Sequence, residues 1–173
     1  WGHRIHVEIG DATDYRLMSR LFEDIKPDVV VHYAEQPSGP YSMMGYDEAR
    51  RTLDNNLGAT FNVIWAVMEH APDCHLIKLG TMGEYGTPNI DIEEGWLEIE
   101  HKGRKDKVLF PRAAGTLYHT TKVLDTDLLW FYVRTHGRPD TRLSEPQGHA
   151  AMRRAGDEQS CRPGGSAHSQ PVH

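Results

Sequence analysis

The feature that most constrains the fold of this chain is a regular alternation of short apolar segments with longer amphipathic ones. The apolar segments have the pattern of strands, and they cover residues 5–9, 29–31 and 75–79. The two amphipathic segments repeat apolar residues at helical spacing, and they cover residues 14–25 and 48–70. A strand, helix, strand, helix, strand order predicts an α/β fold with a doubly wound parallel sheet. Ligands of such sheets bind beyond the carboxyl ends of the strands.

The rest of the chain predicts a hairpin, a further helix and a tail. Acidic residues 91–100 and basic residues 102–107 are typical of a solvated hairpin or excursion. Apolar residues at helical spacing then predict a helix over residues 116–136. Beyond it large apolar residues are sparse, so burial cannot offset the entropy of ordering the segment. We therefore expect a domain over residues 1–137 and a tail, residues 138–173, that is disordered or translated out of frame, which the coding DNA would reveal.

The overall composition argues against several classes of function. A formal net charge of −6 is not that of a dedicated nucleic-acid binder. No apolar run reaches membrane-spanning length and no signal peptide opens the chain, which predicts a cytoplasmic protein, or a stromal one if the source is a plant or alga. Cys74 and Cys161 do not suggest a disulfide, and no histidine pair has metal-binding spacing. We expect no metal, no nucleic-acid partner and no membrane.

Tyr118 and Lys122 lie four residues apart in the last predicted helix and therefore on one of its faces. An ammonium near a phenol favours the phenolate, which would lower the tyrosine pKa from about 10 towards neutrality and make it a general base. The spacing alone is common on solvated helices, where it is a surface contact. Thr81 favours a site, because it lies on a Gly-rich loop directly after the strand at 75–79.

That Gly-rich loop has the spacing of a dinucleotide-phosphate loop but lacks its context. Gly80, Gly83 and Gly86 follow a strand, yet a phosphate loop needs a helix N-terminus directly after the glycines. Residues 87–89 are Thr-Pro-Asn and begin no helical pattern, so we reject this loop as a phosphate site. The sequence has no other Gly-rich strand-to-helix turn. We expect the chain to begin after the unit that would carry one.

These features together resemble the extended short-chain dehydrogenase/reductase superfamily and, within it, the UDP-sulfoquinovose synthase family. The resemblance covers about residues 1–137, and its motifs are residues 35–43, 54–56, 78–95 and 118–122. It implies a partial Rossmann-type sheet that lacks its first strand-helix unit and its C-terminal substrate lobe. The implied parent is an enzyme that makes UDP-sulfoquinovose, the precursor of a sulfolipid head group, from UDP-glucose and sulfite with bound NAD. The implied steps are oxidation at C4, loss of water at C6, sulfite addition and hydride return.

The resemblance also implies roles for the reacting residues. Tyr118 would take the proton of the C4 hydroxyl, and Lys122 would keep Tyr118 ionised and bond the nicotinamide ribose. Thr81 would hydrogen-bond the same sugar oxygen. These three residues are the candidate centre for hydride transfer.

A proton donor for water loss is less directly implied. Related dehydratases carry Asp and Glu after the threonine, whereas this chain has Met82 and Gly83. His119, with an unperturbed pKa near 6.5, is then the candidate donor, and a histidine that faces solvent is an equal alternative. The substitution argues against an ordinary 4,6-dehydratase.

Other contacts follow from the same resemblance. The implied cofactor contacts, besides Tyr118 and Lys122, are Asp11, Ala12, Ala34, Glu35 and Asn56. The implied substrate contacts are Gln36, Tyr41, Ser42, Thr81, Met82, Gly83 and Glu84. Asp11 is alternatively a turn or cap residue, and Asn56, placed at the opening of the second helix, is alternatively a cap or a support for the active-site strand. Pro37 stands where plant members have Arg, so one nucleotide or substrate contact is missing.

Two alternatives to the leading function stay open. The first keeps the superfamily and makes the parent a UDP-sugar 4-epimerase. The second is an inactive fragment that binds no cofactor, since neither a phosphate loop nor a UDP-binding lobe is recognisable. For the leading function the partners are UDP-glucose and sulfite, and the parent is expected to be a homodimer.

Overall fold

The structure is a computed structural model that describes residues 5–89, 91, 96–109, 111–136, 141–144 and 149–154. Its helices are α1 (Tyr15–Ile25), α2 (Tyr46–His70) and α3 (Leu117–His136), with 3₁₀ turns η2 (Tyr41–Met43) and η3 (Met82–Tyr85). Its strands are β1 (Val29–His32), β2 (His75–Leu79), β3 (Trp96–His101), β4 (Arg104–Leu109), β5 (Thr141–Ser144) and β6 (His149–Arg154). The elements expected between residues 14 and 136 are present, whereas the strand expected at residues 5–9 is not.

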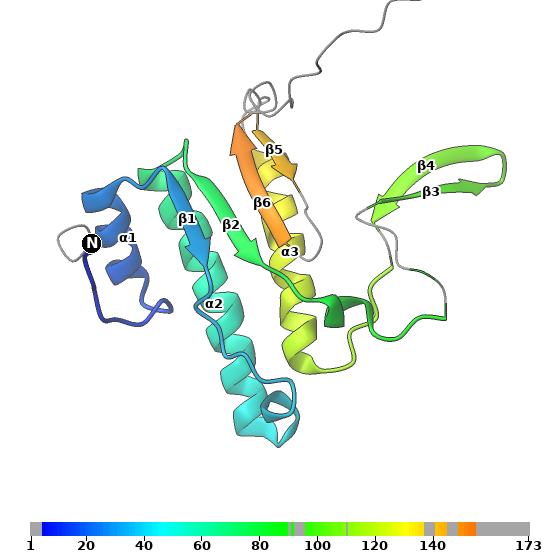
Figure 1. The fold of residues 1–173 in the computed structure, drawn as a ribbon, viewed down its shortest axis with the longest axis horizontal. Coiled ribbons are helices and arrows are strands. Elements are labelled where there is room, and N and C mark those ends of the chain that lie inside the picture. The colour runs from blue at the N-terminus through cyan, green and yellow to red at the C-terminus, as the bar shows by residue number, and fades with distance from the viewer. Residues whose placement is uncertain are drawn as a thin grey trace, which may run out of the picture.

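A small sheet with helices along one face forms the body of the molecule (Figure 1). The strand order is β1-β2-β6-β5. β1 and β2 run parallel, with Val29 opposite His75, and β6 joins β2 in the antiparallel sense. The parallel pair with its connecting helix α2 confirms the predicted α/β class, and the antiparallel strands make the sheet mixed.

The core lies where α2 meets β2 and α3. Ile64 of α2, Leu76 of β2 and Leu129 of α3 are at most 1% exposed, and they pack in one apolar cluster. Asp14 caps α1 by accepting hydrogen bonds from the backbone N–H groups of Arg16 and Leu17, and Asp is among the residues preferred at this position. This packing fixes β2 and α3 relative to one another, and both carry predicted site residues.

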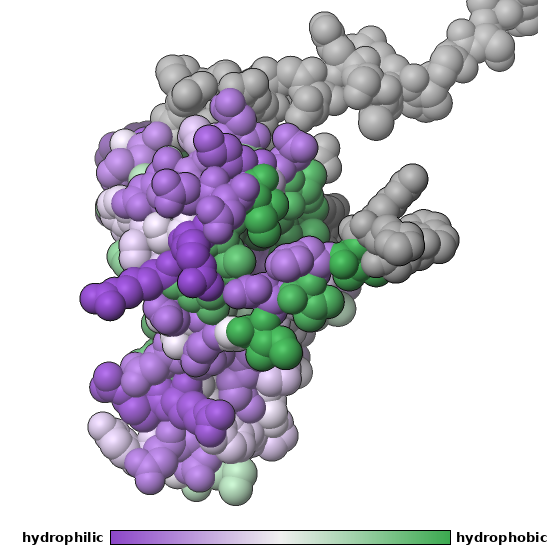
Figure 2. Space-filling model, turned by 90° about the vertical axis from the view of Figure 1, so that its left-hand side faces the viewer, coloured by the Kyte–Doolittle hydropathy of each residue, from purple (hydrophilic) through white to green (hydrophobic). Residues whose placement is uncertain are grey.

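The predicted strand at residues 5–9 is wrong. These residues form no strand, and Ile5, Val7 and Ile9 are 68%, 73% and 94% exposed. A strand needs a neighbour for its backbone hydrogen bonds, and no strand within the described ranges pairs with this segment. Val29 and Val31 of β1 are also exposed, at 54% and 48%. Figure 2 shows apolar groups gathered among polar ones on one face of the molecule.

The hairpin expected from the charged residues is present as β3 and β4. The turn uses Lys102 and Gly103, both at positive φ, and Glu98 pairs with Lys107 across the strands at 3.1 Å. The hairpin extends away from the sheet (Figure 1). Its charged side chains are solvated, as the sequence predicts.

The segment expected to be disordered contains two described strands. β5 and β6 pair with each other, and β6 pairs with β2 through Leu76 to Leu79. For these two strands the structure differs from the expectation, because the unpaired edge of β2 offers hydrogen bonds that the tail's composition does not reveal. The other residues from 138 onward lie outside the described ranges, and the domain boundary at residue 137 stays a prediction.

Candidate active site

The loop after β2 presents Thr81 in a defined conformation. The hydroxyl oxygen of Thr81 accepts a hydrogen bond from the backbone N–H of Gly83 at 3.3 Å. The backbone N–H of Thr81 donates to the carboxylate of Glu84, also at 3.3 Å. This reciprocal capping box fixes the entry to η3. Residues 87–89, directly after Gly86, begin no helix, so the loop lacks the helix N-terminus of a phosphate site.

The start of α3 is fixed by a second loop. The backbone N–H of Tyr118 donates to the hydroxyl of Ser42 at 3.1 Å, and that hydroxyl donates to the carbonyl of Gly39 at 2.6 Å. Ser42 is 1% exposed. Its hydroxyl therefore ties η2 to α3, and its predicted contact with substrate stays a prediction.

Tyr118 and Lys122 share one face of α3, as their spacing predicts. The Nζ of Lys122 lies 5.6 Å from the centroid of the Tyr118 ring. It donates to the carbonyl of Leu79 at 2.9 Å and forms an ion pair with Glu35. The end of β2, the loop after β1 and α3 therefore meet at this ammonium.

The expected lowering of the Tyr118 pKa is wrong for this structure. Burial, and after it the negative charge of Glu35, raise the pKa of Tyr118 above its usual value. Burial also lowers the pKa of Lys122. A free ammonium would lower the pKa of the phenol, whereas the ammonium of Lys122 is neutralised by Glu35.

A second buried lysine lies beside the first. Lys78 of β2 is 1% exposed, and its Nζ lies 2.9 Å from Glu35 Oε1 and 2.6 Å from Asp125 Oδ2. Burial acts to lower the pKa of Lys78, but Asp125 and Glu35 outweigh it and raise that pKa. Burial raises the pKa of Asp125 to about 6. With Lys122, these groups form a buried cluster of two cations and two carboxylates, here called the ion cluster.

The ion cluster contains two residues that the sequence analysis missed. The sequence analysis assigned no role to Lys78, which lies in a predicted strand and in the motif at residues 78–95, or to Asp125, which lies in a predicted helix. Two signals could have found them. A lysine inside an otherwise apolar strand needs a buried partner, and Asp125 lies three residues after Lys122 and so on the same face of α3.

His119 packs against the loop after β2. Its Nδ1 lies 3.1 Å from the hydroxyl of Thr116, and the side chain is half-buried. A Cβ atom placed on Gly83 would lie 2.5 Å from the imidazole ring, closer than any normal contact. The ring therefore occupies the space next to Gly83, and the alternative of a simple solvent-facing histidine does not describe it.

Asn56 links two parts of the site. Its Oδ1 accepts from the backbone N–H of Gln36 at 2.8 Å, and its Nδ2 donates to the hydroxyl of Thr121 at 3.0 Å. The residue lies in the middle of α2 and is 0% exposed, so its expected place at the opening of the helix is wrong. These bonds join the loop after β1 to α3, and direct contact with a cofactor stays a prediction.

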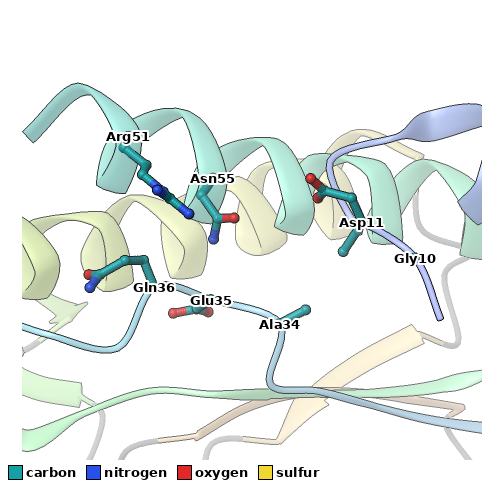
Figure 3. A pocket seen from close by; sticks show the side chains of 8 residues that line it. Gly10, Asp11, Ala34, Glu35, Gln36, Arg51 and Asn55 are labelled. Atoms are coloured by element: carbon teal, nitrogen blue, oxygen red, sulfur yellow. The ribbon is translucent and has the colours of Figure 1, made fainter. Parts of the chain in front are cut away.

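A cavity of about 330 Å³ opens at the carboxyl end of β1. Figure 3 shows its lining: Gly10, Asp11, Ala12, Ala34, Glu35, Gln36, Arg51 and Asn55. Four of these are predicted cofactor contacts. Arg51 and Asn55 reach the cavity from α2 (Figure 3), and the sequence analysis missed them because two polar residues on a helix carry no signal of their own.

The cavity fits part of a nucleotide by its chemistry. Hydrogen bonds from the N–H and hydroxyl of Thr13, both at 2.8 Å, lower the pKa of Asp11 and keep it an ionised acceptor. Small residues, Gly10 and Ala34, leave backbone accessible, and Arg51 supplies a cation. An acceptor, a cation and accessible backbone around a volume of this size provide polar contacts for a ligand.

The remaining predicted substrate contacts differ in exposure. Met82 is 79% exposed, whereas Glu84 is 5% exposed, with its Oε2 3.7 Å from Arg112. Tyr41 is half-buried.

The described ranges contain no group of three or more His, Cys, Asp or Glu residues arranged for a metal ion. None of the helices in the described chain combines the length and apolar character needed to cross a membrane.

Comparison with known proteins adds three findings. Residues 2–139 match the sequence profile of the NAD dependent epimerase/dehydratase family. The chain is 44% identical over 151 residues to the chloroplastic UDP-sulfoquinovose synthase of Spinacia oleracea, covering 87% of this chain and 31% of that protein. It is 48% identical over 145 residues to the UDP-sulfoquinovose synthase of Sulfolobus acidocaldarius, covering 83% and 37%. The chain thus spans about a third of the length of these relatives.

Solved structures share the fold. The UDP-glucose 4-epimerase of Brucella ovis in complex with NAD superposes with a TM-score of 0.60 at 20% identity, covering 75% of this chain and 35% of that one. The UDP-Glc/GlcNAc 4-epimerase of Campylobacter jejuni gives a TM-score of 0.58 at 21% identity, covering 73% and 33%.

Proposed function

From the premise that this chain belongs to the NAD dependent epimerase/dehydratase family, we propose that it is the central catalytic segment of an enzyme that converts UDP-glucose and sulfite to UDP-sulfoquinovose. The proposed route is NAD-dependent oxidation at C4, dehydration at C6 and sulfite addition. One observation carries the proposal. Tyr118 and Lys122 share a face of α3 next to the end of β2, in a chain that is 44–48% identical to two UDP-sulfoquinovose synthases.

The cofactor would bind at the carboxyl end of β1. NAD, when bound, supplies a hydride acceptor for the C4 carbon. Asp11 and Arg51, on opposite walls of the cavity (Figure 3), would hold polar groups of the nucleotide. Lys122 of α3, whose ammonium contacts the end of β2, would bond the nicotinamide ribose. The cavity chemistry supports this assignment, and the inactive-fragment alternative requires that these residues bind no nucleotide.

Tyr118 is proposed as the base that removes the C4 hydroxyl proton, with Thr81 bonding the same oxygen. Because burial and Glu35 raise the pKa of Tyr118, the phenol holds its proton at neutral pH. Its action as a base therefore requires that nearby cations outweigh Glu35 in the reacting complex.

His119 is proposed as the proton donor for loss of water at C6. Met82 and Gly83 cannot donate a proton, and the imidazole fills the space that a side chain at position 83 would need. Thr116 holds the ring through Nδ1, which leaves Nε2 to exchange the proton.

A UDP-sugar 4-epimerase is the second candidate. Epimerisation needs no acid for loss of water, so the absence of acidic side chains at Met82 and Gly83 is compatible with it. The superposition on two 4-epimerases supports the fold only, because the identities are 20–21%. The two candidates differ in their product.

Incubation of the full-length protein that contains this chain with UDP-glucose, NAD and sulfite separates these candidates. A sulfonated nucleotide sugar is expected, and UDP-galactose would support the epimerase. The inactive-fragment alternative concerns these 173 residues alone, and micromolar binding of NAD to them in a calorimetric titration would contradict it. Replacing Tyr118 with Phe should lower kcat by about 10³-fold or more with an unchanged circular dichroism spectrum. Tyr46→Phe is the matched control, since Tyr46 is 78% exposed.

Two properties of the whole protein are proposals of the same kind. We expect a homodimer, which sedimentation of the full-length protein would test. We expect a cytoplasmic or stromal location; the Spinacia oleracea relative is described as chloroplastic, and fractionation of the source cells would decide.

A further inference from the structure

We propose that Lys78 is a second cation of the active site, which holds Glu35 against Lys122 and sets the charge that Tyr118 experiences. The residue is a positioning residue, because it acts through Glu35. The inference rests on the proposed function only for its effect on turnover. Its effect on the phenol of Tyr118 follows from the bridge of Glu35 to Lys122, whose ammonium lies 5.6 Å from the centroid of the Tyr118 ring, and does not require the proposed reaction.

The burial and ion pairs of Lys78 indicate a role beyond stabilising the fold. Its side chain is 1% exposed, and Glu35 and Asp125, its partners at 2.9 and 2.6 Å, are equally buried. Moving such charges out of water costs several kcal/mol per ion, and well-packed apolar residues are often as stable or more stable in their place. Stability alone therefore does not account for a lysine at this position of an otherwise apolar strand.

Glu35 bridges the two lysines. One carboxylate oxygen contacts Lys78 and the other contacts Lys122, whose ammonium is also bonded to the carbonyl of Leu79. Lys78 thus fixes the rotamer of Glu35, and Glu35 in turn fixes the ammonium that faces Tyr118. Asp125 holds Lys78 from the side of α3.

The ion cluster is electrically balanced when all four groups are charged. Loss of Lys78 leaves an excess negative charge beside Tyr118, whereas loss of the Asp125 charge leaves an excess positive one. A nearby negative charge raises a phenol pKa and a positive one lowers it. Glu35 and Asp125 raise the pKa of Tyr118, and Lys78 is the cation that lowers it.

The other titratable groups around Lys78 are few. His32, at the end of β1, has its pKa lowered to about 4 by burial, so it is neutral near pH 7. Glu84, in η3, is coupled to Lys78 and to Lys122, and its pKa is raised by burial. At the alkaline pH where a phenol titrates, His32 is neutral and Glu84 is ionised, so neither changes its charge during the titration of Tyr118.

Direct titration of the Tyr118 phenol tests the proposal. Ultraviolet difference titration of the protein, with Tyr118→Phe subtracted to isolate this phenol, gives its pKa in each variant. Lys78→Met should raise the pKa of Tyr118 and Asp125→Asn should lower it, each by about one unit or more. The double variant should return it to within a few tenths of the original value. Lys107→Met, an exposed lysine of the hairpin, is the matched control and should change nothing.

The directions of the Tyr118 pKa shifts in the two single variants decide whether the proposal holds. Shifts in the same direction for Lys78→Met and Asp125→Asn, or no shift in either, would overturn the proposal, because a merely structural role predicts no opposite signs. If Lys78→Met does not fold, an unchanged pKa in Asp125→Asn overturns it alone. In the full-length enzyme, the rise of kcat with pH should move in the same two directions. Because the phenol titration needs neither substrate nor cofactor, a missing sulfonated product would reject the proposed function and leave this result intact.

Discussion

The strand β2 and the segment at residues 5–9 have similar apolar patterns and different outcomes. In β2, Leu76 is 1% exposed and the backbone pairs with β1 on one side and β6 on the other. In the segment at 5–9, Ile9 is 94% exposed and no described strand pairs with it. An apolar alternation predicts which side chains would be buried, and the neighbouring chain decides whether a strand forms.

The same difference separates the two halves of the candidate site. Tyr118 and Lys122 are held by contacts to β2, Glu35 and η2. Asp11 is fixed mainly by its local bonds to Thr13 at the end of the unpaired segment. The catalytic half is thus held by the folded core, whereas the position of Asp11 in the cofactor half depends mainly on a short-range turn.

The largest expected contrast is between apolar truncations in these two segments. Leu76→Ala removes a buried side chain of the core and should lower the free energy of unfolding by about 2–5 kcal/mol. Ile9→Ala removes an exposed one and should change it by less than about 0.5 kcal/mol. Urea denaturation followed by circular dichroism measures both. A decrease of more than about 1 kcal/mol in the free energy of unfolding of Ile9→Ala would show that the segment is packed and would contradict the expected difference between the two segments.

A pH-dependent contrast is expected from His32, which is 4% exposed and lies 3.1 Å from the hydroxyl of Thr60. Burial lowers its pKa from 6.5 to about 4, so the folded state binds a proton less readily than the unfolded state. The stabilisation is present above pH 6.5 and is lost as pH falls towards 4, by up to about 3 kcal/mol. His32→Gln, which keeps a partner for Thr60, should abolish this loss.

Comparing the original protein with His32→Gln isolates the contribution of His32 to the pH dependence of stability. Asp125, whose pKa is raised to about 6, contributes the opposite slope, since a raised carboxyl pKa makes the folded state more stable as pH falls. This contribution is common to both proteins and cancels in their difference. Denaturation at several values between pH 4 and 7.5 gives that difference. Parallel curves for the original and His32→Gln proteins would mean that His32 titrates normally.

Local patterns in the sequence predicted most of the framework. Helical spacing placed α2 and α3 to within a few residues, and the Tyr118–Lys122 spacing predicted a shared face. Each depends on residues within one or two helical turns of each other. The hairpin was predicted by its charge pattern for the same reason.

Long-range contacts were not predictable in the same way. Lys78 and Asp125 are far apart in the chain, and their pairing appears only once β2 and α3 pack together. The pKa of Tyr118 had the wrong predicted direction because the sequence shows neither the burial of the phenol, which is the largest cause, nor the ion pair of Glu35 with Lys122. The Thr81–Glu84 capping box is different: its Thr-x-x-Glu pattern is local and could have been recognised.

A smaller effect is expected from Asn56, the link between the loop after β1 and α3. Asn56→Ala leaves the buried N–H of Gln36 and hydroxyl of Thr121 without this partner, which should cost about 2 kcal/mol. Asn55→Ala, the matched control, removes one partly buried bond to Asn56 at 3.0 Å and should cost under about 1 kcal/mol. Thermal unfolding of both variants measures the two losses of stability. Equal costs would mean that Asn56 does not couple the two halves of the site.

The smallest expected effect concerns the cap of α1, in the half of the molecule that depends on short-range turns. Asp14→Ala removes the acceptor for the first N–H groups of the helix and should cost about 1 kcal/mol, whereas Asp14→Ser keeps an acceptor and should cost little. Because the loss is local, amide hydrogen exchange should quicken in α1 and remain unchanged in β2. Faster exchange in β2 as well would mean that α1 and the core open as one unit, and the two halves of the site would then not be separable.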